Sequence, residues 1–501
     1  MKTKKFAVLL FTLILALGLF PMGVFAASIP VTPTSKASIT INNAVENDVL
    51  EAYKVVDITY DETSNHVSYV WNSSFADYFA QTNSVTNSAN QAYTVEQFAA
   101  LTDDSDDLKN LLAGLPKYIA DNNIDAAKTA TVGEGGTATF ENLAMGEYFI
   151  RPTNTTSVYQ LMLQKIEPKV EEDSEGNPHY VIEDVTFTAK KEEVTITKTA
   201  DKTSVTKNEK VAYTVAVDIP TYSAEATDKT IYVSDLLPDG LTIDTASINV
   251  KIDGADVNPT AYNLDTTATK DYTFKLSVST QQYTNSWTNQ GGNKLVITYT
   301  ATLNNDNTTE VNVIETNTAT FDYSFYPYVE NSHKQKTDKV DVTTFAIKID
   351  KYVAGSHATK LADAKFDLYR TATDAEIAAG VTETIPHTTI NGIKLESDVV
   401  TNDSGVATFE KYEANGTKYD YYLVETQAPH GYNILAEAVK VNFTDAEATN
   451  GVYTVKVPNS SGITLPITGD EGIVIFTVIG IAFMGGAVIL FVLFHKKAKA
   501  N

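Results

Sequence analysis

The chain contains no cysteine among its 501 residues. This absence excludes disulfide bonds, thiol nucleophiles and thiolate metal ligands. Basic residues are also scarce, because 38 Lys and Arg stand against 63 Asp and Glu and give a formal net charge of -25. Since a phosphate-binding surface needs clustered Lys and Arg, this charge argues against nucleic acid as a partner.

Signals for metal or enzyme chemistry are equally sparse. The 7 histidines are scattered and predict no metal cluster. The acidic run at 103–107 could offer carboxylate oxygens to calcium, but it lacks the spaced loop of an EF-hand and is more typical of a solvated helix start. No serine elbow, zinc motif or paired-carboxylate pocket stands out. We therefore expect no metal, no cofactor and no enzyme that turns over a substrate.

Both ends of the chain have the pattern of processing segments. Residues 1–26 combine N-terminal lysines, an apolar run and the ending VFA, which predicts a signal peptide cleaved after Ala26. Residues 473–494 are uncharged and long enough to span a bilayer as a helix, which needs about 20 residues. The basic tail that follows favours the cytoplasmic side. The sequence therefore predicts an exported protein with a C-terminal transmembrane helix.

A short motif precedes this apolar segment and consists of Leu465, Pro466, Ile467, Thr468 and Gly469. Together with the apolar helix and the basic tail, it resembles the cell-wall sorting signal of Gram-positive bacteria. The resemblance implies that a sortase cuts between Thr468 and Gly469 and transfers the Thr468 carbonyl to an amine. The membrane anchor would hold the precursor beside the enzyme and then be discarded.

Between the two ends, Thr, Val, Tyr and Ile recur with a period of two, as in EVTITKT, KVAYTVAVDI and VYTVKV. This pattern predicts a mainly β protein built from antiparallel sandwiches, with one helical insertion near 94–122. Polar joints near 190 and 343 indicate the domain boundaries. We expect an N-terminal domain at 27–190, a middle domain at 191–343, a C-terminal domain at 344–462 and a sorting segment at 463–501.

The middle and C-terminal domains contain polar residues with the parity of buried ones. Lys198 has the parity of Val194 and Ile196 in VTITK, and Lys351 has the parity of Ile349 in FAIKIDK. The same alternation turns one acid and one asparagine of each domain inward. The expected inward sets are Lys198, Asp235 and Asn317 in the middle domain, and Lys351, Glu425 and Asn459 in the C-terminal domain.

These residue types suit the spontaneous formation of Lys–Asn isopeptide bonds. Burial lowers the pKa of a lysine and raises the pKa of an acid, so both become neutral. The amine can then attack the asparagine carbonyl, while the protonated carboxyl polarises that carbonyl and passes a proton to the leaving ammonia. A buried salt bridge in each domain, or a lysine that reaches solvent from a strand end, is the competing interpretation.

Further motifs carry a resemblance. The segment YYLVETQAPHGY resembles the E-box of Cna-B-type domains, in which the glutamate promotes a Lys–Asn bond. The segments VTITKTADK, VSDLLPDGL and NTATFDY resemble the middle isopeptide domain of Gram-positive pilins, whose acid is an aspartate. The resemblance implies three tandem immunoglobulin-like (Cna-type) β-sandwich domains. It assigns the promoting role to Asp235 and Glu425, with bonds Lys198–Asn317 and Lys351–Asn459.

The N-terminal domain departs from this pattern. In MGEYFIRP, Tyr148 and Ile150 match the residues before an E-box acid, but Pro152 stands at the acid position. Its opening strand, ASITINNAVEN, also lacks a lysine. We therefore expect no isopeptide bond in the N-terminal domain.

A pilus shaft also needs an acceptor amine on the next subunit. Pilin families use a lysine, often in a YPK-type motif near the end of the first domain, and IEPK offers Lys169. Glu167 replaces the aromatic residue of that motif, and the upstream tryptophan is absent. Lys165, Lys190 and Lys191 remain competitors, and a solvated lysine without a role is the default for each of them.

Taken together, the motifs identify the chain as similar to the major, or backbone, pilins of Gram-positive bacteria. This resemblance implies a shaft subunit that a sortase links head to tail through Thr468, which generates an open filament. The implied partners are identical subunits, accessory pilins, the sortase and peptidoglycan, with the finished pilus on the cell surface in support of adhesion. A host receptor is left open. A monomeric wall-anchored adhesin or a basal pilin is the alternative, and a wall-anchored hydrolase is the third class.

Overall fold

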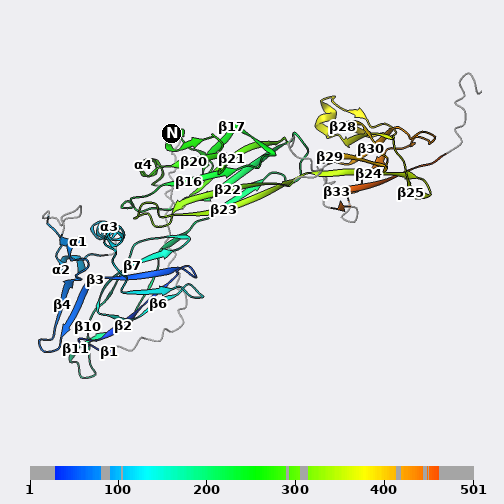
Figure 1. Ribbon diagram of the computed structural model, residues 1–501. Helices are drawn as coiled ribbons and strands as arrows, with labels where there is room; N and C mark the ends of the chain where they lie inside the picture. Colours follow the sequence, from blue (N-terminus) through cyan, green and yellow to red (C-terminus); the bar gives the residue numbers. More distant parts are fainter. Residues whose placement is uncertain are drawn as a thin grey trace, which may run out of the picture.

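The computed structural model describes residues 29–80, 91–102, 105–288, 293–304, 314–412, 419–443, 448–449 and 451–461. Figure 1 shows three β-rich domains that follow one another along an elongated molecule, in the order of the sequence. The predicted fold class of tandem β-sandwich domains, with helices in the first, is confirmed. The exact boundaries near 190 and 343 stay predictions.

The N-terminal domain packs two sheets, in the orders β4-β3-β7-β9 and β12-β2-β6, with a small sheet β1-β11-β10 at one end. Its strands are β1 (Ile29–Pro30), β2 (Lys36–Asn42), β3 (Val49–Asp61), β4 (His66–Trp71), β5 (Lys128–Thr131), β6 (Ala138–Ala144), β7 (Gly146–Asn154), β8 (Ser157–Tyr159), β9 (Met162–Ile166), β10 (Lys169–Glu172), β11 (Pro178–Ile182) and β12 (Val185–Thr188).

The helical insertion lies between β4 and β5. It comprises α1 (Ala76–Ala80), α2 (Val95–Ala99) and α3 (Asp106–Asn122), so helix begins earlier in the chain than the periodicity predicted. The Ser105 side chain caps α3 by accepting from the backbone N–H of Leu108, and acidic residues occupy the first turn, where they complement the helix dipole. Leucines at helical spacing bury one face of α3 against the sheet.

The middle domain is a sandwich of two five-stranded antiparallel sheets, β14-β15-β21-β17-β18 and β19-β20-β16-β22-β23. Its strands are β14 (Ile196–Ala200), β15 (Lys210–Asp218), β16 (Ile231–Leu236), β17 (Leu241–Ile252), β18 (Ala255–Asp256), β19 (Asn263–Asp265), β20 (Phe274–Val278), β21 (Lys294–Leu303), β22 (Ile314–Ser324) and β23 (His333–Thr343). Three short helical turns join β18 to β19 and β20 to β21: η1 (Pro259–Ala261), α4 (Thr280–Gln282) and η2 (Tyr283–Trp287). The inward face alternates strictly along β15 and β21, as the sequence pattern predicts.

The C-terminal domain also has two sheets, β25-β24-β33-β32 with β29 added on β24, and β27-β28-β26-β30-β31. Its elements are β24 (Phe345–Val353), β25 (Ser356–Lys360), β26 (Lys365–Thr371), α5 (Asp374–Ala378), β27 (Glu383–Thr384), β28 (Asn391–Val400), β29 (Val406–Tyr412), β30 (Tyr421–Gln427), β31 (Val439–Lys440), β32 (Ala448–Thr449) and β33 (Val452–Asn459). The first strand, β24, and the last, β33, are parallel neighbours.

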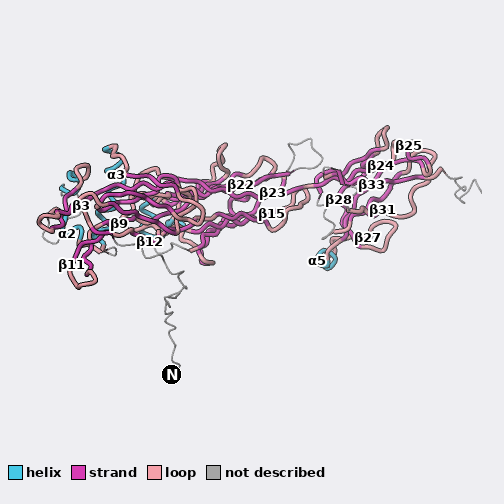
Figure 2. The backbone as a smooth tube through the Cα atoms, turned by 90° about the horizontal axis from the view of Figure 1, so that it is seen from below, coloured by secondary structure: helices cyan, strands magenta, loops and turns pink. Residues whose placement is uncertain are grey.

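The N-terminal and middle domains contact each other through a strand pairing and a hydrogen bond as well as through the connecting chain. Strand β13 (Lys191–Glu193), which leads into the middle domain, pairs with β8 of the N-terminal domain. The hydroxyl of Tyr323, on β22, donates to the Thr156 carbonyl at 2.6 Å. In the turned view of Figure 2, the strands of the two domains run on without a break, whereas the C-terminal domain stands apart.

The predicted processing segments lie outside the described residues. These are the signal peptide at 1–26, the motif Leu465–Gly469 and the apolar stretch 473–494. Within the part of the chain that the structure does describe, no helix is long and apolar enough to cross a membrane.

Candidate functional site

The structure brings the three predicted residues of the middle domain into one buried cluster. Lys198 comes from β14 in one sheet, while Asp235 on β16 and Asn317 on β22 come from the other sheet. Their relative exposures are 4%, 1% and 0%, so water does not reach the cluster. The Lys198 Nζ donates directly to Asp235 Oδ2. Any covalent link from Lys198 to Asn317 would therefore join the two sheets across the core.

A fourth residue, Tyr299 on β21, completes this cluster. Lys198 Nζ donates to the Tyr299 hydroxyl at 2.8 Å, and that hydroxyl donates to Asp235 Oδ1 at 2.9 Å. The Asn317 Nδ2 in turn donates to the Tyr299 hydroxyl at 2.7 Å. Sequence reasoning missed Tyr299, because its parity with Ile297 and Ala301 is the ordinary signal of a core aromatic residue.

The electrostatics of the middle cluster favour neutral groups. Burial lowers the pKa of the Lys198 ammonium, although the Asp235 carboxyl opposes this shift. Burial also raises the pKa of Asp235, against the opposing effect of Lys198. The rings of Tyr213 and Tyr299 lie with their centroids 5.1 and 5.2 Å from Lys198 Nζ and exclude water from it. A neutral amine beside a neutral acid is the pair that attack on an amide needs.

The C-terminal domain holds a second cluster of the same residue types. Lys351 on β24, Glu425 on β30 and Asn459 on β33 are 0%, 2% and 1% exposed. Lys351 Nζ contacts Asn459 Oδ1 and lies 3.1 Å from Glu425 Oε1. Burial lowers the pKa of Lys351, with Glu425 as the opposing charge. Nucleophile and target amide are thus already in contact.

The carboxyl of Glu425 is held by several donors. Asn459 Nδ2 donates to Glu425 Oε1 at 2.9 Å and to Oε2 at 3.1 Å, and also to the Asn433 carbonyl at 3.0 Å. The backbone N–H of Leu435 donates to Oε2 at 2.8 Å. This single carboxyl therefore touches both nitrogens that exchange in isopeptide formation, the lysine Nζ and the asparagine Nδ2.

The N-terminal domain has buried acids but a different arrangement. Pro152, at the position where an E-box acid would stand, pairs with Leu50 on β3. Asp48 accepts from the Tyr159 hydroxyl at 2.6 Å, and burial raises the pKa of Glu147 to about 7. Within the described residues, the buried lysines all belong to the middle and C-terminal domains. The absence of an isopeptide bond in the N-terminal domain stays a prediction, and these surroundings support it.

The four candidate acceptor lysines have different surroundings. Lys169, on the edge strand β10, is exposed and pairs with Glu183 at 2.8 Å. Lys165 and Lys191 are partly buried, and each pairs with the glutamate two residues further along the chain. Lys190 is exposed, and its ammonium forms no ion pair with any residue that the structure describes.

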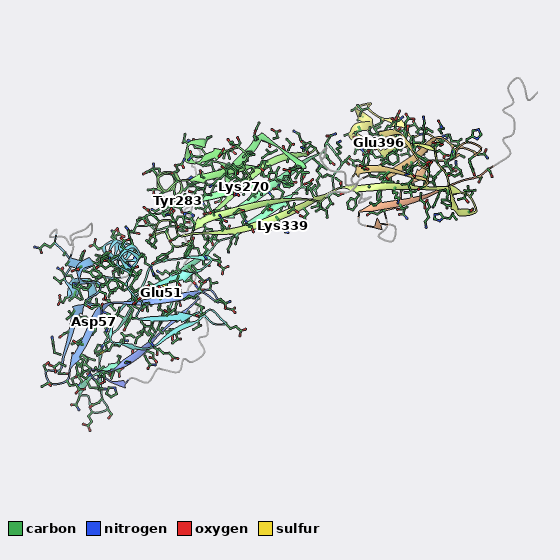
Figure 3. The ribbon with its side chains drawn as sticks, viewed as in Figure 1. Glu51, Asp57, Lys270, Tyr283, Lys339 and Glu396 are labelled. Carbon is green, nitrogen blue, oxygen red and sulfur yellow. The ribbon has the colours of Figure 1, made fainter. Side chains whose placement is uncertain are left out.

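Lys190 also borders a cavity of about 570 Å³ between the N-terminal and middle domains. The walls come from α3, from segment 158–164 and from segment 221–225. Tyr222 lines the cavity and packs against Tyr283, which Figure 3 labels at the end of the middle domain nearest the N-terminal one. The lining mixes polar and apolar side chains, with Asp106 and Glu225 as its acids.

Comparison with known proteins agrees with this architecture. Residues 345–458 match the SpaA family of prealbumin-like fold domains, and residues 457–499 match the LPXTG cell wall anchor motif. The T6 backbone pilin of serotype M6 Streptococcus pyogenes is similar with a TM-score of 0.58 at 16% identity, over 86% of this chain and 100% of that one. The chain has the modular fold of Gram-positive backbone pilins. The resemblance to these pilins predicted from the motifs is confirmed.

Two further proteins are similar to this chain. The full-length major pilin SpaD from Corynebacterium diphtheriae gives a TM-score of 0.52 at 17% identity, over 86% of this chain and 99% of that one. The fimbrial subunit type 1 of Actinomyces viscosus is 31% identical over 154 residues, which is 26% of this chain and 28% of that protein. The match thus spans less than a third of the curated relative.

Proposed function

We propose that this chain is the structural shaft subunit of a covalently polymerised surface pilus. The observation that carries the proposal is the combination of a backbone pilin fold with an LPXTG anchor at its C-terminal end. The anchor provides a donor for sortase transfer, and the elongated stack of domains provides a spacer between successive links. In this function the chain is a sortase substrate and turns over no substrate of its own.

Isopeptide bonds inside the domains are part of the proposal. In the C-terminal domain, the neutral Lys351 Nζ attacks Cγ of Asn459 and forms the Nζ–Cγ bond. Glu425 accepts a proton from Nζ and delivers one to Nδ2, the Cγ–Nδ2 bond breaks, and ammonia leaves. The lysine loses one proton, the ammonia gains it, and the carboxyl ends as it began. The buried contacts of Glu425 with both nitrogens support this route.

The middle domain would form its bond between Lys198 and Asn317, with Asp235 as the promoting acid. Each bond closes a loop of more than a hundred residues. By analogy with the loop entropy of disulfides, such a closure stabilises a domain by roughly 4 to 5 kcal/mol. The bond also changes how the domain bears force. Tension between the ends of the domain then passes through covalent bonds instead of through a sheet whose strands can separate.

Polymerisation requires a lysine of the next subunit to accept the Thr468 carbonyl. Lys169, on the edge strand β10, is the prediction from the local motif, but its ammonium pairs with Glu183. The surroundings support Lys190 more strongly, because its exposed amine forms no ion pair with any described residue and borders the cavity between the two domains. The apolar part of its lining, Leu161 to Leu163 and Phe187, suits the apolar residues Leu465 to Ile467 that precede Thr468. Linkage between the two ends gives a head-to-tail contact, which builds an open filament.

Mass spectrometry of the ectodomain, residues 27–464, tests the crosslinks in the proposal. We expect a deficit of two ammonia molecules, with Lys198 joined to Asn317 and Lys351 joined to Asn459 in tryptic maps. We also expect a ladder of high-mass species in cell-wall extracts from cells that express the full chain. A crosslinked ectodomain without a ladder would favour the alternative, a monomeric wall-anchored adhesin or a basal pilin. An ectodomain without any deficit would remove the isopeptide bonds from the proposal.

A further inference from the structure

We propose that the hydroxyl of Tyr299 relays a proton between Asp235 and Asn317 during crosslinking of the middle domain. This inference rests on the proposed isopeptide function and deepens it. It assigns a reacting role to a residue that the motif resemblance leaves out. It also explains how an aspartate can take the place that a glutamate occupies in the C-terminal domain.

The two clusters differ in what the acid touches. In the C-terminal domain, Glu425 contacts both the lysine Nζ and the asparagine Nδ2. In the middle domain, Asp235 contacts Lys198 Nζ, but Asn317 Nδ2 donates to the Tyr299 hydroxyl instead. Aspartate is one methylene shorter than glutamate, and the phenol oxygen stands in the gap that this leaves.

The Tyr299 hydroxyl is connected to every other member of the cluster. Its oxygen accepts from Lys198 Nζ at 2.8 Å and from Asn317 Nδ2 at 2.7 Å, and its hydrogen is donated to Asp235 Oδ1 at 2.9 Å. The side chain is 2% exposed, so no water competes for these contacts. A continuous path of hydrogen bonds therefore runs from the attacking nitrogen to the leaving nitrogen. It passes from Lys198 Nζ through the Asp235 carboxyl and the Tyr299 hydroxyl to Asn317 Nδ2.

Protons and bonds balance when the reaction follows this hydrogen-bond path. The neutral Lys198 Nζ attacks Cγ of Asn317, and Nδ2 loses its amide resonance and becomes a proton acceptor. The Tyr299 hydroxyl hydrogen, which points to Asp235 Oδ1 before the attack, then turns toward Nδ2. Asp235, protonated on Oδ1, passes its proton to the Tyr299 oxygen, and Tyr299 passes its own proton to Nδ2. Asp235 Oδ2 then takes a proton from Nζ. The Nζ–Cγ bond has formed, the Cγ–Nδ2 bond has broken, ammonia has left, and both Asp235 and Tyr299 are neutral again.

The environment of Tyr299 suits a relay that stays neutral. Burial, and then the nearby Asp235 carboxyl, raise the pKa of Tyr299 far above its ordinary value, so the free phenolate does not accumulate. The ring is fixed between Tyr213, stacked at 5.3 Å between centroids, and Phe274, edge-on at 5.2 Å. A rigid, neutral hydroxyl can give and take a proton in the same step without leaving its place.

Tyr299→Phe is the variant that tests the relay, since it removes one oxygen and keeps the ring. The ectodomain is purified in denaturant from inclusion bodies, refolded by dilution and sampled by peptide mapping over time. We expect the Lys198–Asn317 bond to form about 100-fold more slowly or not at all, the effect usual for a lost acid–base group. The Lys351–Asn459 bond in the same molecules should form at the unmodified rate.

Tyr323→Phe is the matched control. Tyr323 is also fully buried in the middle domain, but its hydroxyl donates to the Thr156 carbonyl, away from the cluster. We expect this variant to crosslink at the unmodified rate. Equal slowing in both tyrosine variants, or an unchanged rate in Tyr299→Phe, would overturn the relay. Absence of the middle bond in the unmodified chain would instead overturn the proposed crosslink, and the relay with it.

Two further measurements keep the relay distinct from a structural role. Asp235→Glu added to Tyr299→Phe should restore crosslinking, because the longer acid reaches Nδ2 directly, as Glu425 does. In the unmodified chain refolded in heavy water, the middle bond should slow more than the C-terminal bond, since one more proton moves. Equal isotope effects at the two bonds, in chains that fold normally, would contradict the relay even if Tyr299→Phe fails to fold.

Discussion

Lys351 and Asn459 lie on neighbouring parallel strands, the first and last of the C-terminal domain, with Lys351 Nζ in contact with Asn459 Oδ1. Lys198 and Asn317 instead approach each other from opposite sheets of the middle domain. The proposed bonds therefore brace their domains differently. One clamps adjacent strands at the ends of a domain, and the other pins two sheets together across a core.

Glu425→Ala should leave the C-terminal domain folded but without its bond. The variant lacks the group that contacts both Lys351 Nζ and Asn459 Nδ2, so the proton transfers have no carrier. Intact mass should show a deficit of one ammonia instead of two. Loss of the loop closure should also lower the free energy of unfolding by roughly 4 to 5 kcal/mol.

Glu396→Ala is the control for this acid. Glu396 belongs to the same domain, as Figure 3 shows, and accepts from the Tyr412 hydroxyl at 2.8 Å, outside the cluster. Its loss should leave both crosslinks intact. Complete bond formation in Glu425→Ala would contradict the role assigned to Glu425.

Lys198→Ala should make the middle domain extensible under force. With the bond in place, the residues between Lys198 and Asn317 are bypassed when the ends of the domain are pulled. Without it, that segment adds roughly 400 Å of contour length at about 3.4 Å per residue. Single-molecule force spectroscopy of the ectodomain measures this step. Lys229→Ala, which removes another buried lysine of the same domain, should not produce it.

The N-terminal domain should lose stability as the pH rises from about 4.5 to about 7. Burial raises the pKa of Glu147 from 4.5 to about 7, so in this range the folded domain binds more protons than the unfolded chain. The neutral carboxyl contributes its full stabilisation when the pH is below the pKa that Glu147 has in the unfolded chain. This contribution is lost as the pH rises through the pKa of the folded domain. At pH 8 the cost reaches roughly 3 kcal/mol at 1.4 kcal/mol per pKa unit.

Glu147→Gln should therefore raise the melting temperature of this domain at pH 8 and leave it nearly unchanged at pH 4. Scanning calorimetry across this range checks the expectation. Glu141→Gln, at an exposed position on β6, is the matched substitution and should change neither value. A Glu147→Gln variant with the same pH dependence as the unmodified domain would show that another group is responsible.

Lys190→Ala should abolish the high-mass ladder of cell-wall extracts while the monomer remains anchored. The proposed acceptor is then missing, but the sorting motif that attaches the monomer is intact. Lys169→Ala is the companion variant and should polymerise normally, because that lysine lies on the edge strand β10 in a pair with Glu183. The opposite pattern, with the ladder lost only in Lys169→Ala, would return the acceptor role to the IEPK motif.

The sequence by itself determined which side chains of the two clusters are buried. Strand alternation is a local property of the backbone, so the parity of Lys198, Asp235 and Asn317 was sufficient to turn each of them inward. In the C-terminal cluster, Lys351 and Asn459 also follow the alternation, whereas every residue of β30 from Tyr421 to Glu425 is buried. The processing segments at both ends are likewise patterns of adjacent residues, although they lie outside the described structure.

Only the tertiary structure decided what each inward side chain meets. Tyr213 and Tyr299 are opposite each other on β15 and β21, and both point into the core. Only the Tyr299 hydroxyl, however, bridges the lysine, the acid and the asparagine of the middle cluster. Lys190 stands beside a cavity whose walls come from α3 and from the middle domain, far away in the sequence. Alternation fixes the face of a strand, but the partner on the opposite sheet depends on how segments more than a hundred residues apart pack together.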